Sequence, residues 1–161
     1  MAEATRIHDR WAPGLVGGIA ALHARFCGAS HGFGAAFEQK VASEFGALMV
    51  RFDPGRDLLR AAEVGGRFLG SIAVDGGADG AQLRFFILDP ALRGQSLGRR
   101  WLCQAVAHAR GAGFRRMFLW MPGHLDAATA LYEAAGFRLE EEGTAAQFGM
   151  PTLERRFGSP L

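Results

Sequence analysis

The sequence predicts a mixed α/β fold, in which helices cover both faces of a central sheet of about six to seven strands. Short runs rich in branched and aromatic residues, typical of strands, alternate with longer segments whose apolar residues recur at helical spacing. Glycine or proline marks most of the changes between the two patterns. No repeat, low-complexity tract or long linker interrupts the 161 residues, so a single domain over residues 1–161 is expected.

The first third of the chain is expected to hold one strand and two helices. The strand is predicted at residues 6–10, and a helix that opens at Pro13 follows it. The apolar stripe of that helix consists of Leu15, Ile19, Leu22 and Phe26. Residues 27–34 are rich in glycine and are expected to form a movable loop. The stripe of the second helix consists of Phe37, Val41, Phe45, Leu48 and Met49.

Most of the predicted strands lie in the remaining part of the chain. Two strands, 58–64 and 67–74, are joined by Gly65 and Gly66, which form a two-residue hairpin signal. A glycine-rich turn at 76–80 leads into a strand at 82–88. The elements expected after the next helix are a strand at 116–121, a helix at 127–135 and strands at 137–141 and 150–157.

The segment from Arg93 to Arg100, Arg-Gly-Gln-Ser-Leu-Gly-Arg-Arg, lies between the strand at 82–88 and an amphipathic helix. The first N–H groups of a helix lack internal partners and carry the positive end of its dipole, so such a turn can bind an anion. Gly94 and Gly98 would let the backbone approach a phosphate. A tight turn with ordinary caps is the alternative interpretation. A P-loop is disfavoured because no Gly-Lys-Ser/Thr follows, and a dinucleotide fingerprint lacks its third glycine and its downstream acid.

Together with Leu131-Tyr132-Glu133-x-x-Gly136-Phe137, the Arg93-Gly94-x-x-x-Gly98 core resembles the GCN5-related N-acetyltransferases (GNAT). Both halves of the family pattern occur in the right order, which makes the joint match more specific than either half. Residues 9–157 further resemble the acetyltransferase half of bacterial proteins that join a MarR-type DNA-binding domain to a GNAT domain. The DNA-binding half would be absent here.

The resemblance implies a GNAT fold whose sheet splays apart between the strands at 82–88 and 116–121, with acetyl-CoA as the co-substrate. The backbone of Phe86, Ile87 and Leu88 would pair with the pantetheine arm as an added strand would. The N–H groups implied for the pyrophosphate belong to Gln95, Ser96, Leu97, Gly98 and Arg99. Arg93, Arg99 and Arg100 would add positive charge, although they can equally be ordinary surface arginines that cap a loop.

Two positions depart from the family pattern. Ser96 stands where the family usually has glycine, which places a Cβ in a turn that must approach phosphate. Leu125 stands where many members carry an asparagine near the pantetheine, and Asp126 is expected to cap the next helix instead. The affinity for the cofactor, rather than the fold, is what these departures put in question.

Tyr132, the only tyrosine of the chain, is the candidate general acid. Attack of an amine on a thioester expels a thiolate, and a phenol that stays protonated at neutral pH can return a proton to the sulfur. A core tyrosine in a helix stripe is the alternative. For the general base the candidates are Glu38 and His31, near the glycine-rich loop, each of which can also be a solvated group. His124 is a further candidate, at the border of the cleft that would hold the acceptor amine.

Composition and charge bear on the expected location of the protein and on its binding of nucleic acids, membranes and metals. A formal charge of +2 with scattered arginines gives no nucleic-acid surface, and no apolar run reaches the roughly 18 residues that span a bilayer. The start of the chain has no signal-peptide pattern, so a cytoplasmic location is expected. Cys27 and Cys103 lack metal-ligand spacing and are interpreted as core-lining thiols, so no metal and no acyl-enzyme are expected. A homodimer through an edge strand near 150–157 is a further expectation.

The function predicted from the sequence is therefore acetyl-CoA-dependent acetylation of a primary amine, on a small molecule or a peptide, by direct attack in a ternary complex. Two alternatives stay open at this point. One is a non-catalytic acyl-CoA-binding sensor or scaffold, and the other is a phosphate-ligand regulatory domain unrelated to CoA.

Overall fold

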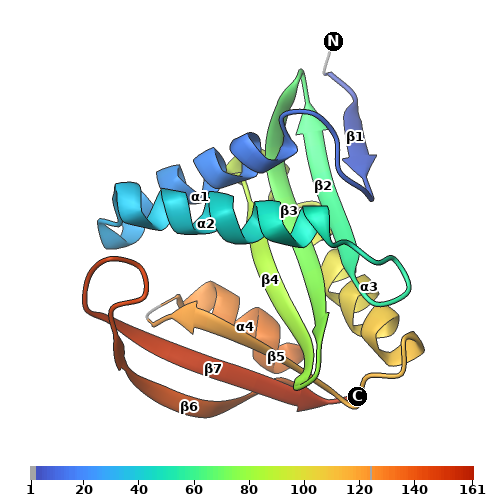
Figure 1. Ribbon diagram of the computed structural model, residues 1–161, viewed down its shortest axis with the longest axis vertical. Helices are drawn as coiled ribbons and strands as arrows, with labels where there is room; N and C mark the ends of the chain where they lie inside the picture. The colour runs from blue at the N-terminus through green and yellow to red at the C-terminus, as the bar shows by residue number, and fades with distance from the viewer. Residues whose placement is uncertain (1–2, 124) are drawn as a thin grey trace.

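The computed structural model describes residues 3–123 and 125–161, and this part of the chain forms a seven-stranded sheet in the order β1-β2-β3-β4-β5-β7-β6 (Figure 1). The strands are β1 Thr5–His8, β2 Leu58–Val64, β3 Arg67–Gly77, β4 Gly80–Leu88, β5 Arg116–Pro122, β6 Arg138–Ala145 and β7 Thr152–Pro160. Neighbouring strands are antiparallel except for β4 and β5, which run parallel. The predicted mixed sheet is confirmed.

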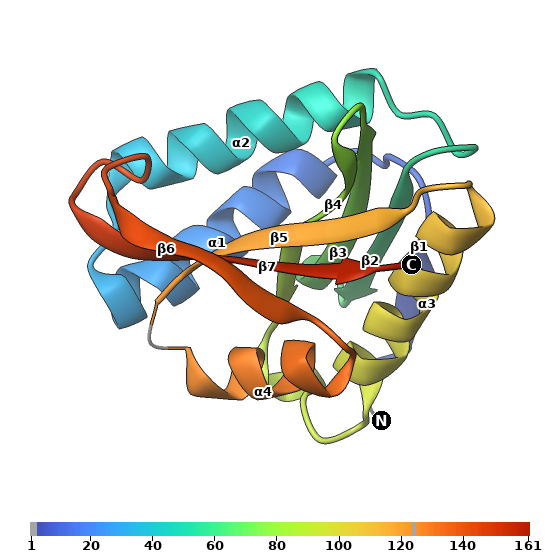
Figure 2. The same cartoon turned by 90° about the horizontal axis from the view of Figure 1, so that it is seen from below.

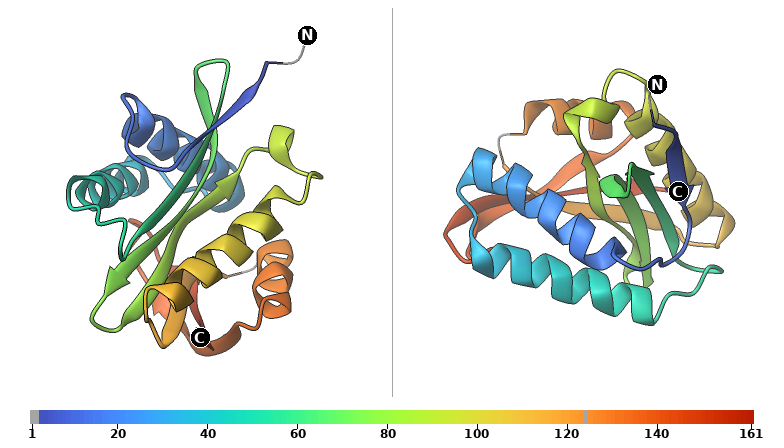
Figure 3. Two further views of the ribbon diagram at one scale, coloured as in Figure 1. Left: turned by 90° about the vertical axis from the view of Figure 1, so that its right-hand side faces the viewer. Right: turned by 90° about the horizontal axis from the view of Figure 1, so that it is seen from above.

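Helices cover both faces of this sheet, as the sequence predicts. α1 (Leu15–His31) and α2 (Ala35–Val50) lie on one face, while α3 (Leu97–Gly111) and α4 (Asp126–Ala134) lie on the other (Figure 3). Successive side chains of a strand point to opposite faces, so the central strands serve both layers. In β2, for example, Leu58 belongs to the core under α3 and α4, whereas Leu59 belongs to the core under α1 and α2.

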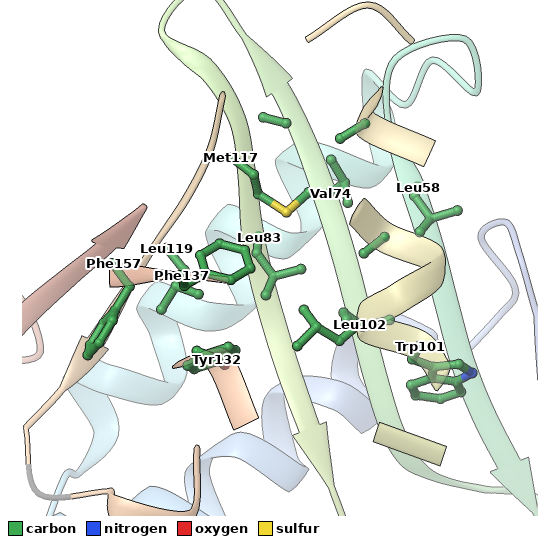
Figure 4. Packing of buried hydrophobic residues seen from close by; sticks show 14 of the residues in the cluster. Leu58, Val74, Leu83, Trp101, Leu102, Met117, Leu119, Tyr132, Phe137 and Phe157 are labelled. Atoms are coloured by element: carbon green, nitrogen blue, oxygen red, sulfur yellow. The ribbon is translucent and has the colours of Figure 1, made fainter. Parts of the chain in front are cut away.

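The larger core lies between the sheet and the helices α3 and α4 (Figure 4). Trp101 and Leu102 of α3 and Tyr132 of α4 contribute to it, and each is at least nine-tenths buried. Tyr132 lies beside Phe137 and Phe157, with ring centroids 6.0 and 6.4 Å away. This packing fixes the position of α4 and of the tyrosine it carries.

Strand β4 contains a β-bulge at Phe85, whose φ of 53° lies in the left-handed region. Ser71 of β3 pairs with Ile87 and Ala73 pairs with Arg84, so three steps along β4 match two steps along β3. The fully buried Ser71 donates its hydroxyl to the carbonyl oxygen of Phe85 at 2.5 Å. A buried hydrogen bond from a neighbouring strand therefore stabilises a backbone conformation that phenylalanine rarely adopts.

The bulge changes the face on which the side chains of β4 lie. Arg84 and Phe85, although consecutive, both contact α2: Arg84 donates to Glu44, and the ring of Phe85 lies 4.8 Å from that of Phe45. The next residue, Phe86, packs against the core on the α3 and α4 face. Regular alternation would place Arg84 and Phe85 on opposite faces, so the bulge decides which side chains meet at this strand.

β4 separates from β5 after Gln82, before the bulge. The two strands pair only through Ala81 with Met117 and Gln82 with Phe118. From there they diverge, and in the described part of the chain residues 83–88 have no strand partner on the side that faces β5 (Figure 2). The splay implied by the family resemblance is therefore present in the structure.

Three sequence predictions need correction. Residues 27–31 belong to α1, because Cys27 packs into the core between α1 and α2; the loop begins only at Gly32, which ends the helix with a φ of 72°. Cys103 is exposed rather than core-lining, since α3 buries the stripe that contains Trp101 and Leu102 instead.

The predicted edge strand near 150–157 is the third correction. β7 lies between β5 and β6 and pairs with both, so it offers no free edge. The edge strand at this end of the sheet is β6, whose residues are all exposed. A homodimer through β7 is therefore excluded by the pairing of its two edges, because each edge already has a partner strand.

Candidate active site

A cavity of about 630 Å³ occupies the place where β4 and β5 diverge. Its walls include residues of α1 and α2 from one face of the sheet, residues of α4 and the start of α3 from the other face, and both diverging strands. Helices on opposite faces can line one cavity only where the sheet between them is open. The split between β4 and β5 therefore joins the two faces through the sheet.

On the α3 side the cavity begins at the loop between β4 and α3. Pro90–Leu92 form a short 3-10 turn, Gly94 has a φ of 81°, and α3 begins at Leu97 without a side-chain cap. In the described chain, no backbone hydrogen bond uses the N–H groups of residues 95–98 outside the helix. These groups cannot bond within α3 either, because the carbonyl groups four residues earlier lie before the helix and are not placed to accept from them. The loop therefore presents free donors at the positive end of a 15-residue helix.

The two glycines of this loop have different roles. A Cβ on Gly98 would lie 3.2 Å from Cδ1 of Leu88 and 3.6 Å from Cζ of Phe86, so glycine lets the first turn of α3 approach β4. Around Gly94 there is open space, and its positive φ is what favours glycine. The loop thus needs one glycine for close packing and one for its backbone conformation.

Ser96 occupies a backbone conformation that favours glycine. It precedes α3 with a φ of 58° and a ψ of 18°, which is the left-handed helical region. For a residue with a Cβ this conformation costs about 1–2 kcal/mol, because the Cβ lies too close to a backbone oxygen. The departure from the family pattern that the sequence shows at this position is therefore a real source of backbone strain.

Replacing Ser96 by Gly is expected to stabilise the protein by about 0.5–1 kcal/mol. The relief of strain exceeds the extra entropy of glycine in the unfolded chain, which costs about 0.5–1 kcal/mol. Urea unfolding of both proteins measures the change as a higher midpoint with an unchanged slope. A midpoint that stays the same or falls would show that the hydroxyl or the Cβ of Ser96 stabilises the loop.

The predicted cofactor residues reach the cavity in part. Phe86, Ile87, Leu88, Arg93 and Gly98 line it. The loop that connects Arg93 to Gly98 consists of Gly94, Gln95, Ser96 and Leu97, which are not among the lining residues. Arg99 and Arg100 are exposed on the first turn of α3, and the guanidinium of Arg93 lies over the ring of Phe26, 5.8 Å from its centroid. Three arginines therefore lie within a few residues of the free N–H groups along the chain.

Tyr132 lines the cavity from α4 and is 7% exposed. Burial raises the pKa of its phenol well above the usual value, because the anionic form would lose hydration. Its ring lies 6.3 Å from that of Phe86, one of the residues expected to bind the pantetheine arm. The structure thus places a neutral phenol, a potential proton donor, next to the unpaired edge of β4.

The start of α4 differs from the sequence prediction. The N-cap position is Leu125, which makes no side-chain cap, and Asp126 is the first residue of the helix rather than its cap. As a first-turn acid, Asp126 still interacts favourably with the helix dipole. Leu125 lines the cavity, where it offers an apolar surface in place of an amide.

The candidate bases do not meet at the cavity. Glu38 is exposed on α2, and His31 stacks on Phe33 with its Nδ1 atom 2.6 Å from Oγ of Ser30; neither side chain is among those that line the cavity. His124 lies outside the described residues. Proximity in sequence to the loop at 32–34 therefore does not bring these groups to the cavity.

Side chains that the sequence analysis did not single out line the α1 and α2 side of the cavity. The charged or ionisable ones are His23, Lys40, Glu44 and Arg84. On the helices, His23 lies one turn after Ile19, and Lys40 and Glu44 lie four residues apart, which is the spacing that places helical side chains on one face. Arg84 reaches the same side only because of the bulge, which the sequence did not predict.

In residues 3–123 and 125–161, no helix is long and apolar enough to cross a membrane. No group of three or more His, Cys, Asp or Glu side chains is arranged there to hold a metal ion.

Comparisons with known proteins agree with this geometry. Residues 22–137 match the family model described as "Acetyltransferase (GNAT) family". No curated protein matches the chain. Among solved structures, an acetyltransferase from Streptococcus agalactiae superposes with a TM-score of 0.74 at 19% identity, over 98% of each chain.

Two other solved structures show the same arrangement. An acetyltransferase from Thermus thermophilus has a TM-score of 0.66 and 20% identity over the whole of both chains. The PaiA N-acetyltransferase from Thermoplasma acidophilum, solved in complex with coenzyme A, has a TM-score of 0.70 and 14% identity, over 98% of this chain and 99% of that one. At such low identity these structures establish the fold alone.

Proposed function

Because this chain belongs to the acetyltransferase (GNAT) family, we propose that it transfers an acetyl group from acetyl-CoA to a primary amine of a small molecule or peptide. The observation that carries the proposal is the cavity that passes through the split between β4 and β5. It gives the donor and the acceptor access from opposite faces of the sheet. The two substrates could then meet inside the split, as direct attack in a ternary complex requires.

The residues around the split fit acetyl-CoA. On the side that faces β5, strand β4 leaves backbone N–H and C=O groups without a strand partner beyond Gln82, and a pantetheine arm carries two amides that can pair with such an edge. The free N–H groups of residues 95–98 would hold the pyrophosphate, and Arg93, Arg99 and Arg100 would supply positive charge. The protein from Thermoplasma acidophilum, which has a similar fold, was solved in complex with coenzyme A, and this supports a CoA compound as the ligand.

The proposed reaction forms one C–N bond and breaks one C–S bond. The uncharged amine attacks the thioester carbonyl, the thiolate leaves, and Tyr132 donates its phenolic proton to the sulfur. The nitrogen loses one proton, which water carries away, and the phenol regains a proton from water. The products are an N-acetylated amine and coenzyme A with a free thiol, so the overall reaction neither consumes nor releases an electron.

Cys27 is the thiol that an acyl-enzyme mechanism would use, because it lines the cavity. Burial raises the pKa of this thiol to about 11, so almost no reactive thiolate exists at neutral pH. Replacing Cys27 by Ala is therefore expected to leave kcat within about threefold, since only packing is lost. Steady-state assays test this, and a loss of a hundredfold or more would favour an acyl-enzyme through Cys27.

The first experiment on the proposed function is a calorimetric titration of the protein with acetyl-CoA, with ATP as the competitor. Binding of acetyl-CoA that ATP does not displace, followed by release of free thiol when an amine is added, would support the transferase. Binding without acetylation of any amine would favour the acyl-CoA sensor, which the comparisons do not favour. ATP that binds more tightly than acetyl-CoA would contradict both.

Three finer expectations stay predictions. One is a closer relation to the acetyltransferase half of MarR-type fusion proteins. The other two are a homodimer and a location in the cytoplasm.

A further inference from the structure

The α1 and α2 side of the cavity is the side left for the acceptor, once acetyl-CoA takes the side with the phosphate loop. Five aromatic side chains from different segments line it: Phe26, Phe37, Phe85, Trp120 and Phe148. Phe148 belongs to the loop between β6 and β7, and its ring lies 5.6 Å from that of Phe37 in an edge-on arrangement. Aromatic surface therefore surrounds the acceptor side from both helices, both strands and the loop.

The charged side chains of α2 and β4 on this side, Lys40, Glu44 and Arg84, are occupied by one another, while Arg93, whose guanidinium lies over the ring of Phe26, is left for the phosphates of acetyl-CoA. Glu44 accepts from Nζ of Lys40 at 2.6 Å and from Nη2 of Arg84 at 2.5 Å. Arg84 also donates to Asp75 at 3.1 Å, and Asp75 accepts from Arg51 at 2.8 Å. Both carboxylates, Glu44 and Asp75, already hold two cations each. A substrate with several charges would have to break these pairs, and that costs binding free energy.

His23 provides a polar group that is still free to bind a ligand. Its Nδ1 atom lies 2.9 Å from the carbonyl oxygen of Ile19, which can only accept, so Nδ1 carries the proton. The lone pair is therefore on Nε2, at the far side of the ring from this hydrogen bond. Burial lowers the pKa of His23 to about 4, which keeps the imidazole neutral at physiological pH. In the described chain no hydrogen bond to Nε2 is found, although the residue lines the cavity.

We propose that the acceptor is a primary amine carried on an aromatic group, with the ring held among the aromatic side chains and the nitrogen donating a hydrogen bond to Nε2 of His23. This inference rests on the proposed function and names the substrate class of the same site. His23 acts as a positioning residue in this role. It holds the amine in place while a proton leaves to water, and it does not itself need to become charged.

Physical chemistry favours this class over amines that carry several charges or an acidic group. An aromatic substrate gains stacking and edge contacts with the rings, and the rings also attract an ammonium group through their negative faces. A neutral imidazole can accept from either an ammonium or an amine. A polyamine finds no unpaired carboxylate among Lys40, Glu44 and Arg84, and an acidic amino acid finds no unpaired cation among them.

The test is equilibrium binding of amines to the protein saturated with coenzyme A, which holds the donor side without allowing turnover. The probes are 2-phenylethylamine, ethylamine, spermidine and glutamate, titrated by calorimetry at pH 7.5. We expect 2-phenylethylamine to bind at least tenfold more tightly than each of the other three. Tighter binding of spermidine or glutamate, or equal binding of ethylamine, would overturn the proposal, as would no binding of 2-phenylethylamine.

Two variants test the role of His23. His23→Phe keeps an aromatic ring but removes the acceptor, and it should weaken 2-phenylethylamine binding about tenfold, because a hydrogen bond to a charged group is lost. His23→Gln places an amide oxygen near the position of Nε2 and should recover the affinity to within about threefold. Both variants should bind coenzyme A as the wild type does. Equal affinities for 2-phenylethylamine in all three proteins would overturn the role of His23.

A nuclear magnetic resonance measurement separates positioning from mere packing. The ¹⁵N shift of Nε2 in the wild type should move on addition of 2-phenylethylamine, while that of Nδ1 stays nearly constant. An unmoved Nε2 signal at saturation would contradict the hydrogen bond. These measurements need no turnover, so they test the amine class even if the protein transfers no acetyl group. In turn, a wrong amine class would not contradict the transferase proposal.

Discussion

Replacing Tyr132 by Phe is expected to lower kcat for acetyl transfer by about 10²–10⁴-fold, while the dissociation constant of acetyl-CoA stays within about twofold. The substitution removes one hydroxyl and keeps the ring. The packing of that ring against Phe137 and Phe157 is therefore preserved, and α4 keeps its place. What is lost is the proton that the leaving thiolate would take from the phenol.

The release of free thiol measures turnover. Turnover and acetyl-CoA binding are measured on the same preparation. A matched control is Phe157→Leu, which disturbs the packing around the same ring without touching the hydroxyl. This control should lower stability by about 1–2 kcal/mol and leave kcat within severalfold. Acetylation by the Tyr132→Phe protein at a rate near that of the wild type would falsify Tyr132 as the general acid.

The pH dependence of kcat/KM in the wild type is a second test of Tyr132 as the general acid. An alkylammonium must lose its proton before it attacks, so kcat/KM should rise with pH toward the pKa of the amine, about 10.4 for a lysine side chain. The acid must stay protonated, and burial raises the pKa of Tyr132, so no fall should appear below about pH 10. Background hydrolysis of the thioester is subtracted at each pH. A descending limb near pH 8 would contradict Tyr132 as a buried acid.

Replacing Gly98 by Asp is expected to weaken acetyl-CoA binding at least a hundredfold, which corresponds to about 2.7 kcal/mol. Gly98 lies in the first turn of α3, beside the free N–H groups of the loop. A carboxylate there would itself accept hydrogen bonds from those N–H groups and would repel a pyrophosphate. The Cβ would lie 3.2 Å from the end of the Leu88 side chain, which can shift by a few tenths of an ångström.

The matched control is Ala107→Asp, which adds the same charge to an exposed position in the middle of α3. It should change acetyl-CoA affinity by no more than about twofold, since screening weakens charges beyond roughly 8–10 Å. Calorimetry measures both variants, and thermal unfolding shows that both remain folded. Similar affinities of the Gly98→Asp variant and the wild type would mean that phosphate does not bind at this loop.

Much of the fold follows from local patterns in the sequence. Phe37, Val41 and Phe45 predict α2, and the structure buries this stripe. Gly65 and Gly66 predict the hairpin between β2 and β3, and both have positive φ values, 57° and 76°. These elements depend on periodicity and backbone preference, which neighbouring residues determine. Their positions could therefore be predicted to within a few residues.

The candidate site could be predicted only in part. The proposed anion-binding turn at Arg93–Gly98 and the helix that carries Tyr132 have sequence signatures, and the structure brings both to the cavity. Only closeness to a loop indicates Glu38 and His31 as base candidates, and these side chains do not line the cavity. His23, Glu44 and Arg84 carry no motif, so nothing in the local sequence distinguishes them from other surface polar residues.

By itself, the sequence determined the mixed α/β class, the glycines of the proposed phosphate loop and the order of the elements along the chain. Only the tertiary structure decided that β4 and β5 separate after Gln82, that Phe85 forms a bulge held by Ser71, and that Arg84 therefore faces α2. The physical reason is that these features depend on contacts between residues far apart in the chain. The cavity passes through the sheet because the pairing between β4 and β5 stops, and no local sequence pattern shows where strand pairing stops.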